Sequence, residues 1–130
     1  MSKLTRQQLI DLAVTSYFGN VDKKNMDAVL ACMHDDIVVT VQTANHDHDG
    51  IEGVRNMFET LFTTYKRTWH GDFEVTADPE NQTVATRFNV TLEKPDGTFD
   101  PPMKNCNFFY VRNGKFFRYY VFMNGVSVLP

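Results

Sequence analysis

The sequence has little cysteine and no long apolar run. Its 2 cysteines, Cys32 and Cys106, lie far apart and outside any CxxC or Cys/His spacing, which excludes a disulfide framework and a structural zinc site. We expect two reduced, buried thiols and no bound metal. No stretch approaches the roughly 20 apolar residues of a membrane helix, and residues 1–5 lack the pattern of a secretory signal. A cytoplasmic protein that does not contact membranes is therefore expected.

The sequence also lacks a basic run. Its 13 lysines and arginines are outnumbered by 16 aspartates and glutamates, which gives a net charge of −3. Nucleic acid is not expected as a partner, because proteins that bind it neutralise phosphates with clustered positive charge. No cofactor is expected either.

Apolar and aromatic residues are what the chain does have. Hydrophobic residues make up 42% of it and include 11 Phe, 5 Tyr and 1 Trp. A chain of 130 residues with this composition is long enough to bury a core of its own. It fits one domain over residues 1–130.

Two helices are predicted near the start. Thr5 and Gln8 form a capping box ahead of apolar residues at helical spacing, and Gly19-Asn20 is the predicted end of this helix. Asn25 is suited to cap a second, short helix, which His34-Asp35-Asp36 ends.

A short strand, a polar loop and the longest helix are predicted next. The strand covers residues 37–42, and the loop over residues 43–50 contains His46 and His48. An unbroken apolar stripe from Ile51 to Tyr65 then predicts a helix that packs one face on a sheet.

After that helix the apolar period changes to two, which predicts long strands. Trp69 and Phe73 alternate with polar residues such as His70, so they are expected on the inner face with His70 on the outer face. In the next strand, Phe88 is expected inside and Arg87 outside.

The last two strands are predicted to form a hairpin over residues 103–112 and 115–124, joined by Asn113-Gly114 in a type I′ turn. That two-residue turn predicts that Phe108 faces Tyr119 on the inner side. The other face mixes polar and aromatic residues: Asn105, Asn107, Phe109, Phe116, Arg118, Tyr120 and Phe122. Because three helices can cover only one face, the outer, convex face is expected to form the interface of a homodimer.

The order of these elements resembles the nuclear transport factor 2-like superfamily, which includes ketosteroid isomerases and SnoaL-like polyketide cyclases. Three stretches carry the resemblance: residues 17–36, residues 50–58 and Asn113-Gly114-Lys115-Phe116. It implies an α+β fold of the cystatin-like kind, in which a cone-shaped, curved antiparallel sheet wraps around three N-terminal helices. It identifies the fold and leaves the activity open, because one fold hosts many functions.

The resemblance also implies where catalytic residues would lie. Tyr17 matches the tyrosine that stabilises the enolate oxygen in the isomerases, but Val41 stands in place of the base and Cys106 in place of the acidic donor. The base of the polyketide cyclases falls at about Val121. Residues 87–89 read Arg-Phe-Asn, whereas epoxide hydrolases of this fold have an aspartate two residues after the arginine.

Three residues are candidates for catalysis. Tyr17 would polarise a substrate oxygen, and His46 or His48 would supply the base, since imidazoles beside carboxylates are competent for proton transfer. The competing interpretations are a buried core tyrosine and a solvated turn. We expect an apolar pocket of several hundred Å³, lined by Phe58, Phe62, Trp69, Phe73, Phe88, Cys106, Phe108, Tyr119 and Met123.

Two functions stay open at this point. The first is an isomerase, cyclase or dehydratase that moves a proton on a small hydrophobic carbonyl compound. The second is a non-catalytic domain for ligand binding or dimerisation, favoured by the apolar residues at the base positions of the relatives.

Overall fold

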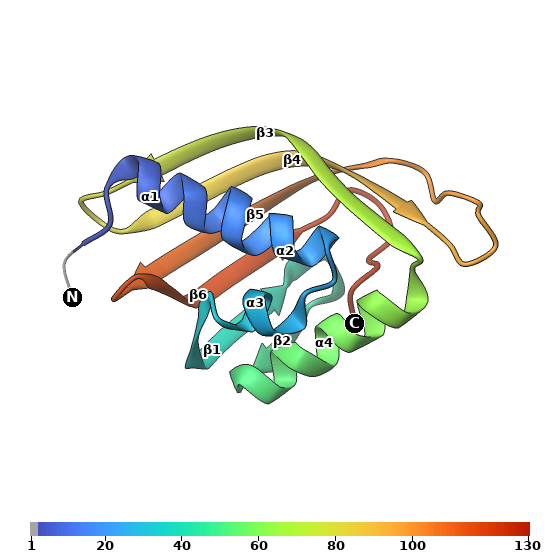
Figure 1. The fold of residues 1–130 in the computed structure, drawn as a ribbon, viewed down its shortest axis with the longest axis horizontal. Helices are drawn as coiled ribbons and strands as arrows, with labels where there is room; N and C mark the ends of the chain where they lie inside the picture. The colour runs from blue at the N-terminus through green and yellow to red at the C-terminus, as the bar shows by residue number, and fades with distance from the viewer. Residues whose placement is uncertain (1–2) are drawn as a thin grey trace.

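The computed structural model describes residues 3–130 as a curved six-stranded sheet with the helices on its concave side (Figure 1). The elements follow in the order α1 (Arg6–Asp11), a π-helical segment (Leu12–Phe18), α2 (Gly19–Asp22), α3 (Met26–Leu30), β1 (Met33–Val41), a 3₁₀ helix (Gln42–Ala44), β2 (His46–Asp49), α4 (Gly50–Thr64), β3 (Arg67–Asp78), β4 (Thr83–Glu93), β5 (Met103–Arg112) and β6 (Lys115–Phe122). The predicted α+β class is confirmed.

The strands are ordered β2-β1-β6-β5-β4-β3 in the sheet. Neighbouring strands are antiparallel, except that β1 runs parallel to β6. The sheet is therefore mixed, whereas the sequence predicted a purely antiparallel one.

The first helix begins as predicted and ends later. The Thr5 hydroxyl accepts a hydrogen bond from the Gln8 amide, and the Gln8 side chain accepts one from the Thr5 amide. The predicted end at Gly19-Asn20 is wrong, because Gly19 keeps helical dihedral angles (φ −59°, ψ −40°) and the helix continues through Asp22. This added turn brings the Asp22 carboxylate to β3.

Strand pairing overrides two further predictions. The short strand begins at Met33, because Met33 pairs with Phe116 and the Phe116 amide donates to the Cys32 carbonyl at 2.8 Å. The predicted polar loop contains β2, whose residues pair with 38–41 of β1. This strand is polar because it lies at the edge of the sheet with one face in water, so it shows no apolar alternation.

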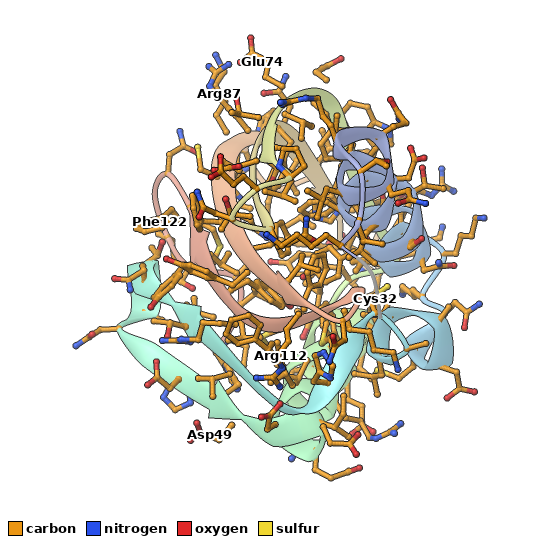
Figure 2. The ribbon with its side chains drawn as sticks, turned by 90° about the vertical axis from the view of Figure 1, so that its left-hand side faces the viewer. Cys32, Asp49, Glu74, Arg87, Arg112 and Phe122 are labelled. Carbon is orange, nitrogen blue, oxygen red and sulfur yellow. The ribbon has the colours of Figure 1, made fainter. Side chains whose placement is uncertain are left out.

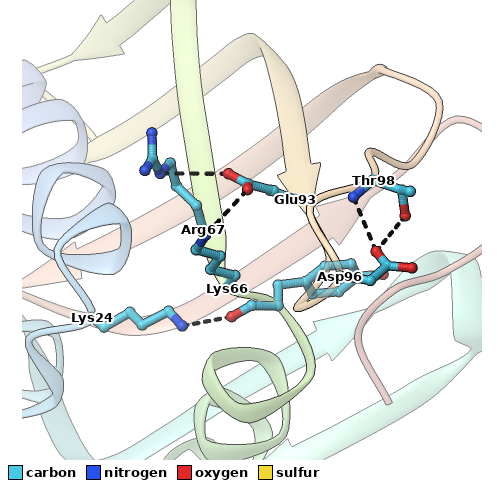
Figure 3. Close-up of polar contacts among 7 residues, drawn as sticks. Lys24, Lys66, Arg67, Glu93, Asp96 and Thr98 are labelled. Atoms are coloured by element: carbon cyan, nitrogen blue, oxygen red, sulfur yellow. Dashed lines mark hydrogen bonds and ion pairs between the residues drawn. The ribbon is translucent and has the colours of Figure 1, made fainter.

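Polar contacts fix the junction between α4 and β3 (Figure 3). The Lys24 ammonium donates to the main-chain carbonyls of Phe62 at 2.8 Å and Tyr65 at 2.5 Å, which satisfies the C-terminal end of α4. The Glu93 carboxylate on β4 lies 3.7 Å from both Lys66 and Arg67 at the start of β3. These contacts fix where β3 begins along β4.

A bulge in β3 reverses the faces that the sequence predicted for its first half. Gly71 pairs with Asn89 and Glu74 with Arg87, so Asp72 and Phe73 together face one residue of β4. Asp72 has a φ of 53°. Before the bulge Thr68 and His70 point inward, and after it Phe73 does. One unbroken alternation cannot describe both halves.

A second bulge corrects the register of the last hairpin. Val111 pairs with Phe116 as predicted, but Phe109 and not Phe108 pairs with Tyr119, because β6 contains one extra residue after Phe116. Phe116 and Tyr119 thus both point inward and are fully buried.

On β4 the predicted faces are correct. Phe88 is buried, whereas Arg87 projects from the outer face and pairs with Glu74 at 2.5 Å. Figure 2 shows Arg87, Glu74 and Phe122 on the side of the sheet away from the helices. Among residues 3–130, no helix combines the length and apolar character that crossing a membrane requires.

Candidate functional site

A small cavity lies between the first helix, α4 and the concave face of the sheet. Its volume is about 40 Å³, room for water but far below the roughly 300 Å³ or more of a typical ligand pocket. The expected pocket of several hundred Å³ is therefore absent from the enclosed space of residues 3–130. Most of the wall is apolar: Phe18, Val21, Phe58, Leu61, Phe88, Val90, Leu92, Met103, Val121, Met123, Val128 and Leu129.

Four polar side chains share this wall, namely Tyr17, His70, Asn105 and Asn107. Tyr17 is buried, and its hydroxyl lies 2.8 Å from the hydroxyl of Tyr119. Burial raises the pKa of both phenols well above the usual value of about 10. Both hydroxyls therefore stay protonated at neutral pH and keep the ability to donate a hydrogen bond.

His70 is hydrogen-bonded to Asp22 beside the cavity. Nδ1 of His70 lies 2.5 Å from one oxygen of Asp22, and the other oxygen of Asp22 accepts from the His70 amide at 2.8 Å. The Thr68 hydroxyl also donates to Asp22, at 3.1 Å. An ionised carboxylate only accepts hydrogen bonds, so Nδ1 carries the proton and Nε2 is the ring nitrogen left to meet a ligand. The ring packs against both Phe18 and Phe88, with centroids at 5.0 and 5.5 Å.

Asn105 and Asn107 bring amide groups into the cavity from β5. The Asn105 side-chain oxygen accepts from the Asn124 amide at 3.3 Å. The side-chain oxygen of Asn107 is buried and has no hydrogen-bond partner within residues 3–130. A buried acceptor without a partner is costly, so this oxygen is a place where a water or a ligand donor would bind.

Three residues predicted to line the pocket point away from it. Trp69 is 43% exposed on the outer face, where its ring lies over Gly71, because the bulge in β3 turns Thr68 and His70 inward. Cys106 and Phe108 lie on the outer face because the bulge in β6 puts Asn105, Asn107 and Phe109 inside. The expectation of two buried thiols holds for Cys32 and fails for Cys106.

The other predicted lining residues lie inside or near the core. Phe58, Phe88 and Met123 are on the cavity wall. Phe62 is half-buried against Phe58, and Phe73 against Phe18 and Phe88. Tyr119 is fully buried behind Tyr17 and does not itself line the cavity.

The histidines on β2 do not meet Tyr17. His46 is exposed, and His48 is buried with its Nε2 2.6 Å from the main-chain oxygen of Pro130. Their rings lie 4.6 Å apart at the edge of the sheet, and neither lines the cavity. No cluster of three or more His, Cys, Asp or Glu within the described range is arranged to hold a metal ion.

Sequence reasoning missed the residues that bring polar chemistry to the cavity, which are Asp22, His70, Asn105 and Asn107. Asp22 was hidden by the apparent helix end at Gly19-Asn20, and the other three by the two bulges. A signal was present in β5, where Asn105 and Asn107 alternate with residues that the register leaves outside. Two amides in one inward row are unusual in a core and indicate a polar ligand or water.

The fold is of the α+β class, with a curved six-stranded sheet and a small cavity between its concave side and the helices. The SnoaL-like domain model matches residues 14–119, and the chain belongs to this family. No curated protein matches the chain significantly.

Solved structures support the same fold. The chain is similar to a candidate polyketide cyclase of Xanthomonas campestris pv. campestris, with a TM-score of 0.79 and 22% identity over 89% of this chain and 90% of that one. It is also similar to an NTF2-like protein of unknown function from Exiguobacterium sp. 255-15, with a TM-score of 0.73 and 17% identity over 91% and 99%. TerC, co-crystallised with polyporic acid, gives a TM-score of 0.76 and 14% identity over 90% and 92%. The predicted nuclear transport factor 2-like fold is confirmed.

Proposed function

We propose that this protein transfers a proton on a small apolar carbonyl compound, with the His70–Asp22 pair as its general base. The observation that carries the proposal is the His70 ring on the cavity wall with Nδ1 held by Asp22 at 2.5 Å. This arrangement fixes the tautomer and leaves the lone pair of Nε2 for a substrate proton. His70 therefore takes the role of general base that the sequence suggested for His46 or His48, which lie on β2 away from the cavity.

The proposed step is proton abstraction next to a carbonyl group. Nε2 of His70 takes a proton from the carbon beside the carbonyl, the electron pair moves onto the carbonyl oxygen, and the enolate is stabilised by hydrogen-bond donors. The Tyr17 hydroxyl and the side-chain amides of Asn105 and Asn107 are the donors on the same wall. Return of the proton to another carbon completes an isomerisation. In a cyclisation the enolate carbon attacks a second carbonyl group of the same molecule, whose oxygen takes the proton. In a dehydration the enolate expels a β-hydroxyl group, which leaves as water with that proton.

The proposed substrate is apolar because the wall is. Aromatic and aliphatic side chains make up most of the wall around Tyr17, His70, Asn105 and Asn107. TerC was co-crystallised with polyporic acid, so a small organic compound as ligand agrees with that structural neighbour. Residues 1–130 act as one domain in this proposal, without a cofactor, and its two unpaired cysteines suit a reducing compartment such as the cytoplasm.

A second candidate function is ligand binding without turnover. It is favoured by Val41 and Val121, which are buried and apolar. They stand at the positions where the ketosteroid isomerases and polyketide cyclases that this sequence resembles have their catalytic base. In that case the pair of Asp22 and His70 serves to tie the end of α2 to β3.

A homodimer through the convex face is part of the same proposal. Phe122 is 47% exposed there, and two grooves of about 430 and 380 Å³ meet at Phe108 and Phe122. Arg118 stacks over Tyr120 on this face at 4.4 Å. Aromatic and arginine side chains are enriched in interfaces. Sedimentation of Phe122→Glu against the parent tests this; an unchanged dimer, or a monomeric parent, would contradict it.

Proton transfer can be tested without knowing the product. The protein is incubated in D₂O with a steroid β,γ-enone, a β-tetralone and an aryl β-diketone, and deuterium uptake at the α-carbon is followed by NMR. We expect catalysed exchange with at least one compound, an at least 100-fold slower rate in His70→Gln, and a slower rate in Asp22→Asn.

His46→Gln is the matched control, because it removes an imidazole from an exposed position off the cavity. It should exchange deuterium at the parental rate. Saturable binding of a compound with no exchange above the buffer rate would favour the non-catalytic candidate, and equal loss in His46→Gln and His70→Gln would rule out His70 as the specific base.

A further inference from the structure

The last residues of the chain form part of the cavity wall. After β6 ends at Phe122, residues 123–130 form neither helix nor strand, and their path returns toward α4 (Figure 1). Val128 and Leu129 line the cavity and pack, partly buried, against the core. Both side chains therefore help to enclose the cavity.

A larger hollow lies on the other side of the same segment. It has a volume of about 600 Å³ and is lined by Tyr65, residues 100–102 and residues 124–128. Met103 and Val128 line both this outer groove and the cavity. The two spaces therefore share part of one wall, to which this segment contributes Val128.

The segment is anchored at one point and loosely held beyond it. The Asn124 side chain accepts from the Lys104 amide at 2.7 Å, and the Asn124 amide donates to Asn105 at 3.3 Å. Within the part of the chain described, one hydrogen bond connects residues 125–130 to other elements, that between His48 and the Pro130 carbonyl. The Ser127 hydroxyl bonds within the segment, to the Leu129 carbonyl.

Gly125, which follows Asn124, has a backbone conformation that favours glycine. Gly125 has a φ of 94°, a conformation that strains any residue with a Cβ, and a Cβ placed there would meet no atom within 4 Å. Val126, next in sequence, is 85% exposed. Rotation about Gly125 would break the core contacts of Val128 and Leu129 and the hydrogen bond between His48 and Pro130.

We propose that Val128 and Leu129 occupy the ligand site in this structure, and that residues 125–130 swing outward about Gly125 to admit a ligand. The ligand would take the apolar space of these two side chains and extend into the outer groove. The unpartnered oxygen of Asn107 lies on the same wall, so the ligand class is an apolar molecule with a hydroxyl group that donates to it. The inference rests on the proposed function in taking this cavity as the ligand site.

The hinge is tested with 8-anilinonaphthalene-1-sulfonate as the probe, in the full chain. Gly125→Ala strains the closed segment and should raise the open population, tightening dye binding about fivefold. Gly97→Ala is the matched control, because Gly97 also has a positive φ of 86° and open space around its Cβ, but lies in the loop after β4. Equal dye affinity in the parent, Gly125→Ala and Gly97→Ala would overturn the inference.

Amide hydrogen exchange locates the movement. Dye binding should speed exchange at residues 126–129 in the parent, and Leu129→Ser should show fast exchange there without dye. Dye that binds with unchanged exchange in this segment would contradict the inference.

His70→Gln distinguishes this inference from the proposed function. It should lose deuterium transfer, while dye binding still speeds amide exchange at residues 126–129. A mobile segment in a protein that never catalyses exchange would refute the function and leave the hinge standing, whereas catalysis with a rigid segment would refute the hinge alone.

Discussion

The hydroxyl groups of Tyr17 and Tyr119 lie 2.8 Å apart although 102 residues separate them in the chain. Tyr17 comes from the first helix and Tyr119 from β6, so this hydrogen bond joins the helix to the concave face of the sheet. The Tyr17 ring also packs edge-on against Phe18, Phe109 and Phe116, with centroids 4.7 to 5.8 Å away. The pair is a polar contact inside an aromatic cluster.

The two hydroxyl groups of this pair should contribute to the free energy of unfolding in a non-additive way. Tyr17→Phe and Tyr119→Phe should each lower the free energy of unfolding by about 1–2 kcal/mol, because the remaining hydroxyl is left buried without its partner. The double variant restores an apolar pair and should cost less than the sum of the single variants. Urea unfolding of the four proteins measures this. Additive losses would show that the two hydroxyls do not depend on each other.

Three buried tyrosines should resist ionisation at alkaline pH while the chain is folded. Burial raises the pKa of Tyr17 and Tyr119 well above 10, and burial with the Asp100 hydrogen bond raises the pKa of Tyr65 to about 12. These phenols ionise in the unfolded chain before they do in the folded one, so their stabilisation is complete below about pH 10 and is lost as pH rises beyond it. Absorbance at 295 nm should show Tyr17, Tyr65 and Tyr119 ionising together with unfolding. Ionisation of these three below the unfolding transition would contradict this.

The fold could be predicted from the sequence, whereas the polar part of the site could not. The capping box at Thr5, the stripe of α4 and the turn at Asn113-Gly114 are local signals, and each is present as predicted. A bulge depends on the partner strand and has no clear local signal. One extra residue turned His70 inward, and another moved Asn107 inside, so the errors fall on the cavity residues.

The position of Trp69 gives a direct test of the bulge in β3. A Cβ built on Gly71 would lie 2.1 Å from the Trp69 ring, which covers Gly71 on the outer face. Gly71→Ala should therefore displace the indole into water, shift the emission of this single tryptophan to longer wavelength, and lower stability by about 1 kcal/mol.

Gly53→Ala is the control for that variant. Gly53 lies inside α4, where a Cβ would make ordinary contacts with His48 at 3.5 Å or more. It should leave the emission unchanged and raise stability by about 0.5–1 kcal/mol, as expected for alanine in a helix. An unshifted emission spectrum in Gly71→Ala would mean that the ring does not rest on Gly71.

The two cysteines should differ in reactivity by orders of magnitude. Cys106 is exposed on the convex face, whereas Cys32 is buried, and burial raises the pKa of the Cys32 thiol to about 11. About one Cys32 thiol in a thousand is then ionised at pH 8, and the thiolate is the reactive form. With Ellman's reagent at pH 8 we expect one fast thiol per chain, absent in Cys106→Ser and kept in Cys32→Ser, and a second thiol only after unfolding. If the convex face pairs two copies, the fast rate should fall as protein concentration rises, since Cys106 would be covered. Two fast thiols in the folded chain would contradict the burial of Cys32.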